Sequence, residues 1–248
     1  MTDEHEEGLA GDKQEMERIR KKIDVTDSYC IQQYGAGLEL RMAELSGQIM
    51  TRVRAFEEND TQTLIRQLLD KLEDPEDTKP YDTGESKGFW EKLSGYVSKR
   101  GRRSYEKIRA EVDEIAGQLD KSRMELLKEL TLLDKLYEKN MEYYHRLELY
   151  IKAGEEELEH VKVFRHPEIS EQAKGSGDAM DQEIVQNDKN MMEQFERRLY
   201  QLKLARTMAM QAGPQIRLLE NNCRITADKI QEILTVTIPV WKQRMPEK

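Results

Sequence analysis

The sequence predicts an all-α protein, built as an elongated antiparallel hairpin or bundle of long helices with coiled-coil-like packing. Charged residues make up 36% of the 248 residues and the hydrophobic set only 37%. That composition supplies narrow apolar seams between helices rather than a deep core. Helix-forming residues dominate, and β-branched runs are missing. Apolar residues recur at alternating steps of three and four from 105 to 165, which is typical of one long amphipathic helix.

The N-terminal third divides into three predicted segments. Residues 1–28 are polar and charge-dense, which predicts a frayed or helical N-terminal tail. Residues 29–72 predict a long helix to about residue 56 and then a short helix, which begins at the capping sequence Asn59-Asp60-Thr61. Residues 73–88 hold two Pro and two Gly among acidic residues, which predicts a linker.

The remaining segment, 89–248, is predicted to hold a basic segment followed by the long-helix coiled-coil region. Pro167 is expected to end the long helix, because its ring cannot continue the hydrogen-bond ladder. A turn region is then expected over 167–177.

Two further prolines are expected to shape the C-terminal helices. The next helix is predicted to run from 178 to 212, where Gly213-Pro214 interrupts it and Pro214 begins another helix. Pro239 is then expected to kink or end that last helix.

Composition also narrows the classes of function. A net charge of −9 disfavours non-specific nucleic-acid binding. The N-terminus lacks the apolar region of a signal peptide, and no stretch is apolar enough to span a bilayer, so a cytoplasmic protein is expected. Cys30 and Cys223 lie far apart in sequence; two reduced thiols are the favoured reading, and one disulfide is the alternative.

Residues with metal-binding or phosphate-binding chemistry are present but poorly arranged. Two Glu-x-x-His pairs, Glu142 with His145 and Glu157 with His160, fall about 22 Å apart on one predicted helix, so they cannot share one metal ion. The short Gly-x-Gly sequences follow no predicted strand and match no phosphate-binding motif. We therefore expect no metal, no cofactor and no catalytic residues, and the chain is not expected to be an enzyme.

The strongest local feature is a basic, aromatic-rich segment in an otherwise acidic chain. Residues 85–109 contain eight Lys or Arg against three Glu. Such a segment could bind an anionic membrane surface, an acidic partner or a small oxyanion. The alternative is a structural role, in which its aromatic residues pack on the hairpin and its cations cover acidic neighbours. The candidate binding residues are Lys99, Arg100, Arg102 and Arg103.

Arg217 is a second basic candidate. It follows Pro214, where a predicted helix start would offer backbone N–H groups to an anion. Contact with an acidic neighbouring helix is the favoured alternative for this residue.

Four stretches go beyond a generic coiled-coil pattern. They are LELRMAELSGQIMTRVR after Tyr34-Gly35-Ala36-Gly37, LLKELTLLDKLYEKNMEYYHRLELYIKAGEEEL (126–158), FERRLYQLKLARTMAMQAGPQIRLLENN (195–222) and KIQEILTVTIPVWKQ (229–243). Together they resemble the TelA-like toxic anion (tellurite) resistance family over about residues 30–243. The resemblance implies a helical bacterial protein associated with resistance to tellurite and other stresses. Family members continue with further helix beyond the Trp-Lys-Gln segment, so a C-terminally truncated member is expected.

The expected function is a non-enzymatic helical scaffold or interaction protein in a toxic anion stress response. Its partners would be other proteins or further copies of itself, bound through helical faces; no nucleic acid is expected. Two alternatives remain: direct oxyanion binding, and a peripheral membrane-associated coiled-coil protein docked on an anionic surface.

Overall fold

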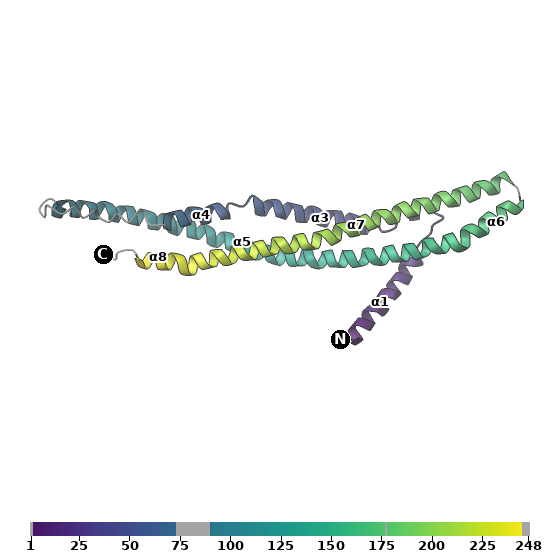
Figure 1. The fold of residues 1–248 in the computed structure, drawn as a ribbon, viewed down its shortest axis with the longest axis horizontal. Coiled ribbons are helices and arrows are strands. Elements are labelled where there is room, and N and C mark those ends of the chain that lie inside the picture. The colour runs from purple at the N-terminus through teal and green to yellow at the C-terminus, as the bar shows by residue number, and fades with distance from the viewer. Residues whose placement is uncertain (1, 73–89, 177, 245–248) are drawn as a thin grey trace. The chain divides into compact units, whose positions relative to one another are not determined.

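All elements of the described chain are helices, which confirms the all-α prediction (Figure 1). The computed structural model describes the backbone of residues 2–72, 90–176 and 178–244, and the side chains of 11–72, 106–175 and 178–243. Within these ranges no helix carries an apolar stretch that could cross a membrane. The elements are α1 (Thr2–Arg20), α2 (Ser28–Gln33), α3 (Ala36–Glu57), α4 (Thr61–Leu72), α5 (Trp90–His160), the π-helical turn η1 (Val161–Arg165), α6 (His166–Ser176), α7 (Ala179–Glu232), the π-helical turn η2 (Ile233–Thr237) and α8 (Ile238–Arg244).

The chain forms two compact units, and α5 and α7 contribute to both. The first unit combines the residues up to Arg52 with Asp134–Leu218. Here α5 and α7 run antiparallel: Asn140 Nδ2 donates to Ala209 O at 2.9 Å, and Lys203 Nζ lies 2.6 Å from Glu155 Oε1.

The second unit combines Val53–Leu133 with the residues from Leu219 onward. Lys242 Nζ of α8 lies 2.6 Å from Asp113 Oδ1 of α5, and Lys71 of α4 pairs with Glu111 of α5. The ion pair with Lys71 lowers the pKa of the Glu111 carboxyl. α4 begins where the capping sequence predicted it, with Asn59 Oδ1 accepting the N–H of Thr61 at 2.8 Å.

The core of the first unit gathers around Tyr34. Its hydroxyl donates to Tyr150 O at 2.6 Å, and its ring packs edge-on against Phe195 with centroids 5.4 Å apart. Burial raises the pKa of the Tyr34 phenol. The apolar side chains of this core come from α1, the α1–α2 segment, α2, α3, α5, η1 and α7, and include Ile19, Val25, Ile31, Leu38, Leu147, Ile151, Val161, Leu199, Leu202 and Ala205.

The single helix predicted from 29 to 56 is wrong, because the chain breaks between α2 and α3. Gly35 adopts a φ of 69°, a left-handed conformation that disfavours side chains. A Cβ atom at this position would also lie 2.7 Å from Leu202 Cδ2. Arg198 Nε then donates to the carbonyl of Tyr34 at 2.7 Å, so a side chain from α7 satisfies the end of α2.

The expected turn over 167–177 is also wrong, because α6 occupies most of it. In a regular α-helix a proline ring clashes with the carbonyl four residues earlier. The chain widens into the π-turn η1 before Pro167, and the N–H of His166 bonds to Val161 O, five residues back. The same arrangement precedes Pro239, where Ile238 N–H bonds to Ile233 O in η2 and the helix continues as α8. The chain therefore stays helical on both sides of Pro167 and Pro239.

The third expected break, at Gly213-Pro214, does not occur either, since Pro214 lies inside α7. Asn140 of α5 reaches this place and donates to Ala209 O. Pro214 has no N–H, so this turn of α7 lacks one backbone hydrogen bond. The Asn140 side chain of the neighbouring helix adds a hydrogen bond to the same turn. α5 likewise begins earlier than predicted, at Trp90, and includes the basic run.

Gly154 provides a direct test of how closely the helices of the first unit approach. A Cβ atom there would lie 2.4 Å from Leu199 Cδ2 and 3.2 Å from Tyr34 Cε1. We expect Gly154→Ala to lower the free energy of unfolding by about 1–3 kcal/mol, because these buried neighbours must shift. Urea unfolding followed by circular dichroism measures the change.

The matched control is Gly47→Ala in α3, where an added Cβ would meet nothing within 4 Å among the described atoms. This variant should gain about 0.5–1 kcal/mol, since alanine restricts the unfolded chain and favours helix. Equal stability of the two variants would contradict the close approach of α5, α7 and Tyr34.

Candidate functional site

For the predicted basic patch, Lys99 to Arg103, the structure describes only the backbone. Lys99, Arg100, Arg102 and Arg103 lie within the helical backbone of α5, but their side chains are outside the described residues. Their role stays a prediction.

Arg217 lies in the interior of α7, so the expected helix start beside it is wrong. Its guanidinium carbon stacks 3.7 Å from the centroid of the Tyr137 ring, and Nη1 lies 3.2 Å from Asp134 Oδ1. These contacts hold Arg217 against α5, and the carboxylate of Asp134 is the acidic neighbour that the sequence suggested as the alternative to an anion.

A pocket of about 310 Å³ lies beside Arg217, between α5 and α7. Asn140 is its deepest polar residue, only 1% exposed, and its Oδ1 atom has no hydrogen-bond partner within the described part of the chain. The rest of the lining is mostly apolar or aromatic: Tyr137, Met141, Tyr144, Ala209, Met210, Gly213 and Pro214.

A second pocket, of about 400 Å³, lies between α2 and α7 and has a more polar lining. Two consecutive arginines of α7, Arg197 and Arg198, contribute to it. It is lined by Ser28, Ile31, Gln32, Gln194, Arg197, Arg198 and Gln201. Both arginines lie inside the 195–222 stretch, but nothing in the sequence distinguishes them as site residues, since only the tertiary fold brings α2 opposite them.

Arg198 is the central charge of this pocket and is 9% exposed. Besides the bond from Nε to Tyr34 O, its Nη1 atom lies 2.7 Å from Glu39 Oε2 and donates to Gln201 Oε1 at 2.7 Å. The remaining guanidinium nitrogen, Nη2, is buried and has no partner among the described residues. A buried donor without a partner is unusual, because leaving it unpaired costs free energy.

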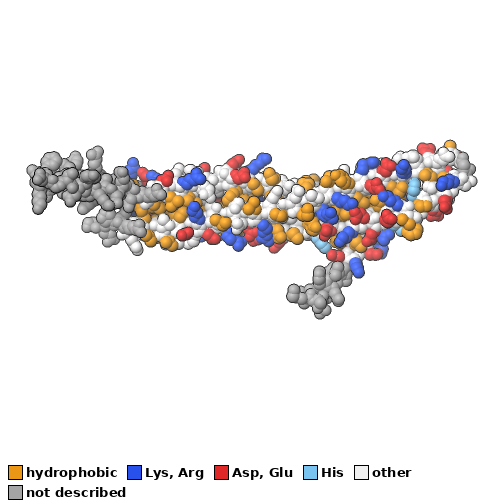
Figure 2. All heavy atoms as spheres, in the orientation of Figure 1, with side chains coloured by type: hydrophobic (Ala, Val, Ile, Leu, Met, Phe, Trp, Pro, Cys, Tyr) orange, Lys and Arg blue, Asp and Glu red, His pale blue; other side chains and the backbone are white. Residues whose placement is uncertain are grey.

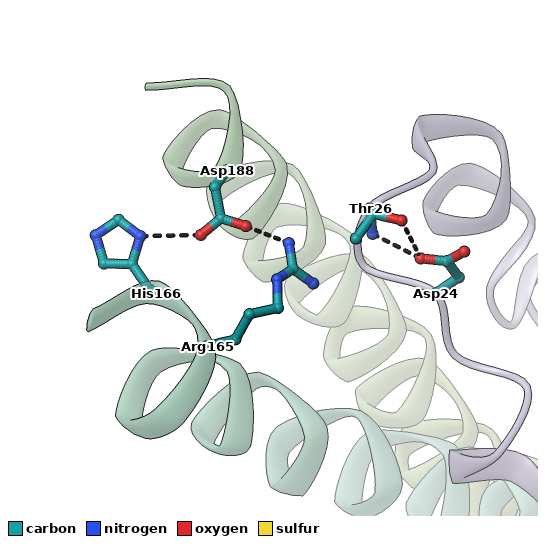
Figure 3. Close-up of polar contacts among 5 residues, drawn as sticks. All are labelled: Asp24, Thr26, Arg165, His166 and Asp188. Carbon is teal, nitrogen blue, oxygen red and sulfur yellow. Dashed lines mark hydrogen bonds and ion pairs between the residues drawn. The ribbon is translucent and has the colours of Figure 1, made fainter. Parts of the chain in front are cut away.

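A polar cluster around the buried Asp188 carboxylate lies where η1 meets α6 (Figure 3). The Asp188 carboxylate of α7 is 3% exposed; it accepts from Arg165 Nη2 and lies 2.9 Å from His166 Nδ1. Nearby, the Thr26 hydroxyl and backbone N–H both bond to Asp24 and lower the pKa of its carboxyl. Asp188 therefore fastens α7 to the junction of η1 and α6.

The two Glu-x-x-His pairs take part in separate contacts. His145 Nε2 lies 2.8 Å from Asp12 Oδ1 on α1, whereas His160 Nδ1 lies 3.7 Å from Glu157 Oε1. No group of three or more metal-ligating side chains occurs within the residues that the structure describes.

Both cysteines are thiols in the structure. Cys223 is fully buried, and its pKa rises to about 11 through burial and the nearby negative charge of Glu129. Cys30 is half-buried, and a hydrogen bond to Asp27 raises the pKa of its thiol.

Large hydrophobic side chains remain on the surface between the charged ones, as Figure 2 shows. On α7 the exposed residues include Tyr200 at 62%, Leu204 at 49% and Leu218 at 63%. We call these three residues the α7 stripe.

The fold places the chain among all-helical proteins whose compact units are built from antiparallel long helices. A family model, the toxic anion resistance protein TelA, matches residues 16–246. The chain belongs to this family, which confirms the resemblance noted in its sequence.

Curated relatives support the assignment. A TelA-like protein of Staphylococcus saprophyticus is 28% identical over 236 residues, which cover 94% of this chain and 62% of the relative. A TelA-like protein of Staphylococcus haemolyticus is 28% identical over 234 residues, covering 94% of this chain and 60% of the relative. The chain thus spans about three-fifths of the length of these relatives. No solved structure matches it.

The Asp188 cluster predicts a specific loss of stability. Asp188→Asn removes the charge that faces Arg165 and His166 but keeps the size of the side chain. We expect about 2 kcal/mol less stability, because a hydrogen bond to a charged group typically contributes that much. The measurement is urea unfolding at neutral pH; Glu183→Gln, an exposed change on the same helix, serves as control and should change little.

The two thiols should differ in reactivity. At pH 8 we expect one fast thiol per chain, Cys30, because Cys223 is buried and its pKa of about 11 leaves little thiolate. Alkylation counted by mass spectrometry should show the second modification only in urea, and Cys30→Ser should abolish the fast phase. Alkylation of Cys223 as fast as that of Cys30 in the folded chain would contradict the structure.

Proposed function

We propose that this member of the toxic anion resistance family is a non-enzymatic cytoplasmic interaction protein, a helical scaffold that binds through exposed helix faces. The observation that carries the proposal is the α7 stripe, three exposed apolar side chains on one side of α7 in the first unit. Apolar area of this kind gains free energy when a partner covers it.

The stripe lies on the side of α7 away from its core face. Leu218 follows Tyr200 by 18 residues, about five helical turns, so the two side chains project in nearly the same direction, with Leu204 beside that line. The core-facing Leu202 and Ala209, both 0% exposed, project to the opposite side of the helix. α7 therefore has two apolar faces, of which one is covered by its own unit.

A second copy of the chain fits the stripe best among protein partners. In a two-fold contact, residue i of one copy meets residue j of the other and the reverse. Two antiparallel stripes would place Tyr200 of each copy against Leu218 of its partner, with no charged side chain of the stripe between them.

The clearest altered pKa values support a structural rather than catalytic use of these groups. The buried Tyr34 phenol bonds to a backbone carbonyl, and Glu111 pairs with a lysine of its own unit. Each shift is explained by packing or by an ion pair within its unit.

Membrane docking through Lys99, Arg100, Arg102 and Arg103 is the alternative that the composition of the basic segment favours. Flotation with anionic liposomes separates it from protein binding. Membrane docking requires that the chain floats with the liposomes and that the variant with these four residues changed to Gln does not. If the parent chain stays at the bottom of the gradient, this alternative fails.

The interaction function predicts a loss of self-association in a stripe variant. Tyr200→Glu, Leu204→Lys and Leu218→Lys together should convert a concentration-dependent dimer into a monomer, because the charges would be desolvated at the contact. Light scattering across a concentration series measures the mass, and circular dichroism checks that the helices remain. In the host, the variant should protect less against tellurite than the parent chain.

The matched control changes three exposed polar positions of α7 that lie N-terminal to the stripe, Gln182, Gln186 and Asn190, to Ala and should keep both mass and tolerance. If the parent chain is a monomer at all concentrations and the stripe variant protects as well as the parent, the proposed function is wrong.

A further inference from the structure

We propose that α1 is a releasable strap over a helix-docking face of α5, and that this face binds an amphipathic helix with the charge pattern of α1. In the structure the chain's own α1 occupies the face. Figure 1 shows α1 leaving the paired α5 and α7 at an angle, with its C-terminal end against them. The inference does not depend on the α7 stripe, which lies on another helix.

Two ion pairs fix the position of α1 on α5. Asp12 Oδ1 lies 2.8 Å from His145 Nε2, and Arg20 Nε donates to Glu157 Oε2 at 2.9 Å. The residue numbers rise together in the two pairs, so α1 runs parallel to α5 along this stretch.

An apolar patch lies between these two pairs on α5. Leu149 is 7% exposed and Ala153 is 0% exposed; they are four residues apart, so they lie on one side of the helix. Leu147 projects to the other side, together with Gly154, where Leu199 of α7 packs. We call Leu149 and Ala153, with His145 and Glu157 at the two ends, the strap seat.

α1 has a face that matches the strap seat. Met16 and Ile19 belong to the same apolar cluster as the two apolar residues of the seat. They lie between Asp12 and Arg20 at helical spacing, so all four side chains share one face of α1. The carboxylate meets His145 and the guanidinium meets the opposite end of the seat. A helix with this order of charges therefore fits in one direction only, because the reverse direction would bring like charges together.

α1 is held weakly compared with the rest of its unit. Among its described side chains, residues 11–20, only Ile19 is buried and six are exposed. The side chains of Asp12 and His145 are 40% and 50% exposed, and exposed ion pairs contribute little. An isolated helix of this length that contains Gly8 and Gly11 is marginal in water. Release of α1 therefore costs less free energy than unfolding of the unit.

The chain has a natural stopping point for this opening, just after α1. Val25 is 2% exposed and anchors the α1–α2 segment in the core. Beside it, the N–H and the hydroxyl of Thr26 both bond to Asp24. α1 can therefore swing out at residues 21–24 while α2 and the Tyr34 core stay packed.

Thiol labelling of the folded full chain measures the opening. In a Cys30→Ser background, Leu149→Cys places a thiol under the strap, and Leu147→Cys is the matched control on the α7 side of the same helix. We expect Leu149→Cys to react at least about tenfold faster, because it needs only the release of α1, whereas Leu147→Cys needs the unit to unfold. Equal rates at the two positions would overturn the strap.

A pair of charge variants assigns the opening to α1. Arg20→Gln removes the bond to Glu157 and should raise the labelling rate of Leu149→Cys several-fold without changing that of Leu147→Cys. Arg18→Gln removes the same charge from α1, but Arg18 is exposed and pairs only with Glu15 of its own helix among the described residues, so the rate should stay unchanged. An equal effect of the two variants would contradict the assignment.

The docking face is tested with a fluorescent synthetic peptide of residues 8–24, added to the full chain and followed by anisotropy. The chain with Ile19→Asp should bind this peptide at least about tenfold more tightly than the parent chain, because its own α1 no longer competes for the seat. The peptide carrying Ile19→Asp should not bind. Circular dichroism checks that the Ile19→Asp chain keeps its helices.

The outcomes separate this face from the interaction function. A peptide that binds neither chain, or binds both equally, would overturn the docking face. The stripe variant should keep the labelling rates and the peptide affinity of the parent chain, whereas the Arg20→Gln chain should keep the mass of the parent.

Discussion

The first unit depends on one close approach, that of α7 to α5 and to the turn between α2 and α3. Gly154 lets Leu199 and Tyr34 fill the space where a side chain would stand, and Gly35 does the same for Leu202. Because interiors are packed at the density of organic crystals, this approach sets the position of every core residue around it. The hydroxyl of Tyr34 then reaches the carbonyl of Tyr150, and the fold leaves that polar group satisfied within an apolar core.

The same approach places Arg198 where it has two consequences. Its side chain satisfies the end of α2, which the left-handed Gly35 leaves without a helical partner. A buried guanidinium is then oriented beside a pocket, with one nitrogen unsatisfied among the described residues. The α2–α3 turn therefore depends on one buried arginine of α7. The cost of burying this charge is offset by the carbonyl, by Glu39 and by Gln201.

The prolines show how a long helical path tolerates residues that normally end it. Pro167 and Pro239 each follow a π-turn, in which a wider ring of backbone hydrogen bonds accommodates the ring of the proline. Pro214 stays inside α7, where Asn140 from the neighbouring helix contributes a donor. Buried apolar residues flank Pro167 and Pro239, among them Val161, Ala173, Ile233 and Ile238, and their packing holds the helical path in place.

Composition and apolar periodicity predicted the helical class and the antiparallel pairing within the units, because these depend on local preference and on the spacing of residues along one helix face. The family was recognised from specific sequence stretches, not from that periodicity. Composition and periodicity did not determine where helices end. Sequence rules treat proline and glycine as breaks, whereas the backbone accommodates Pro167 and Pro239 in the π-turns η1 and η2, and Asn140 of the neighbouring helix bonds to the turn before Pro214. The Gly35 break was hidden for the opposite reason, since the apolar pattern continues across it. The Arg198 pocket was decided by the tertiary structure alone, because its residues come from 28–32 and 194–201 and only packing brings them together.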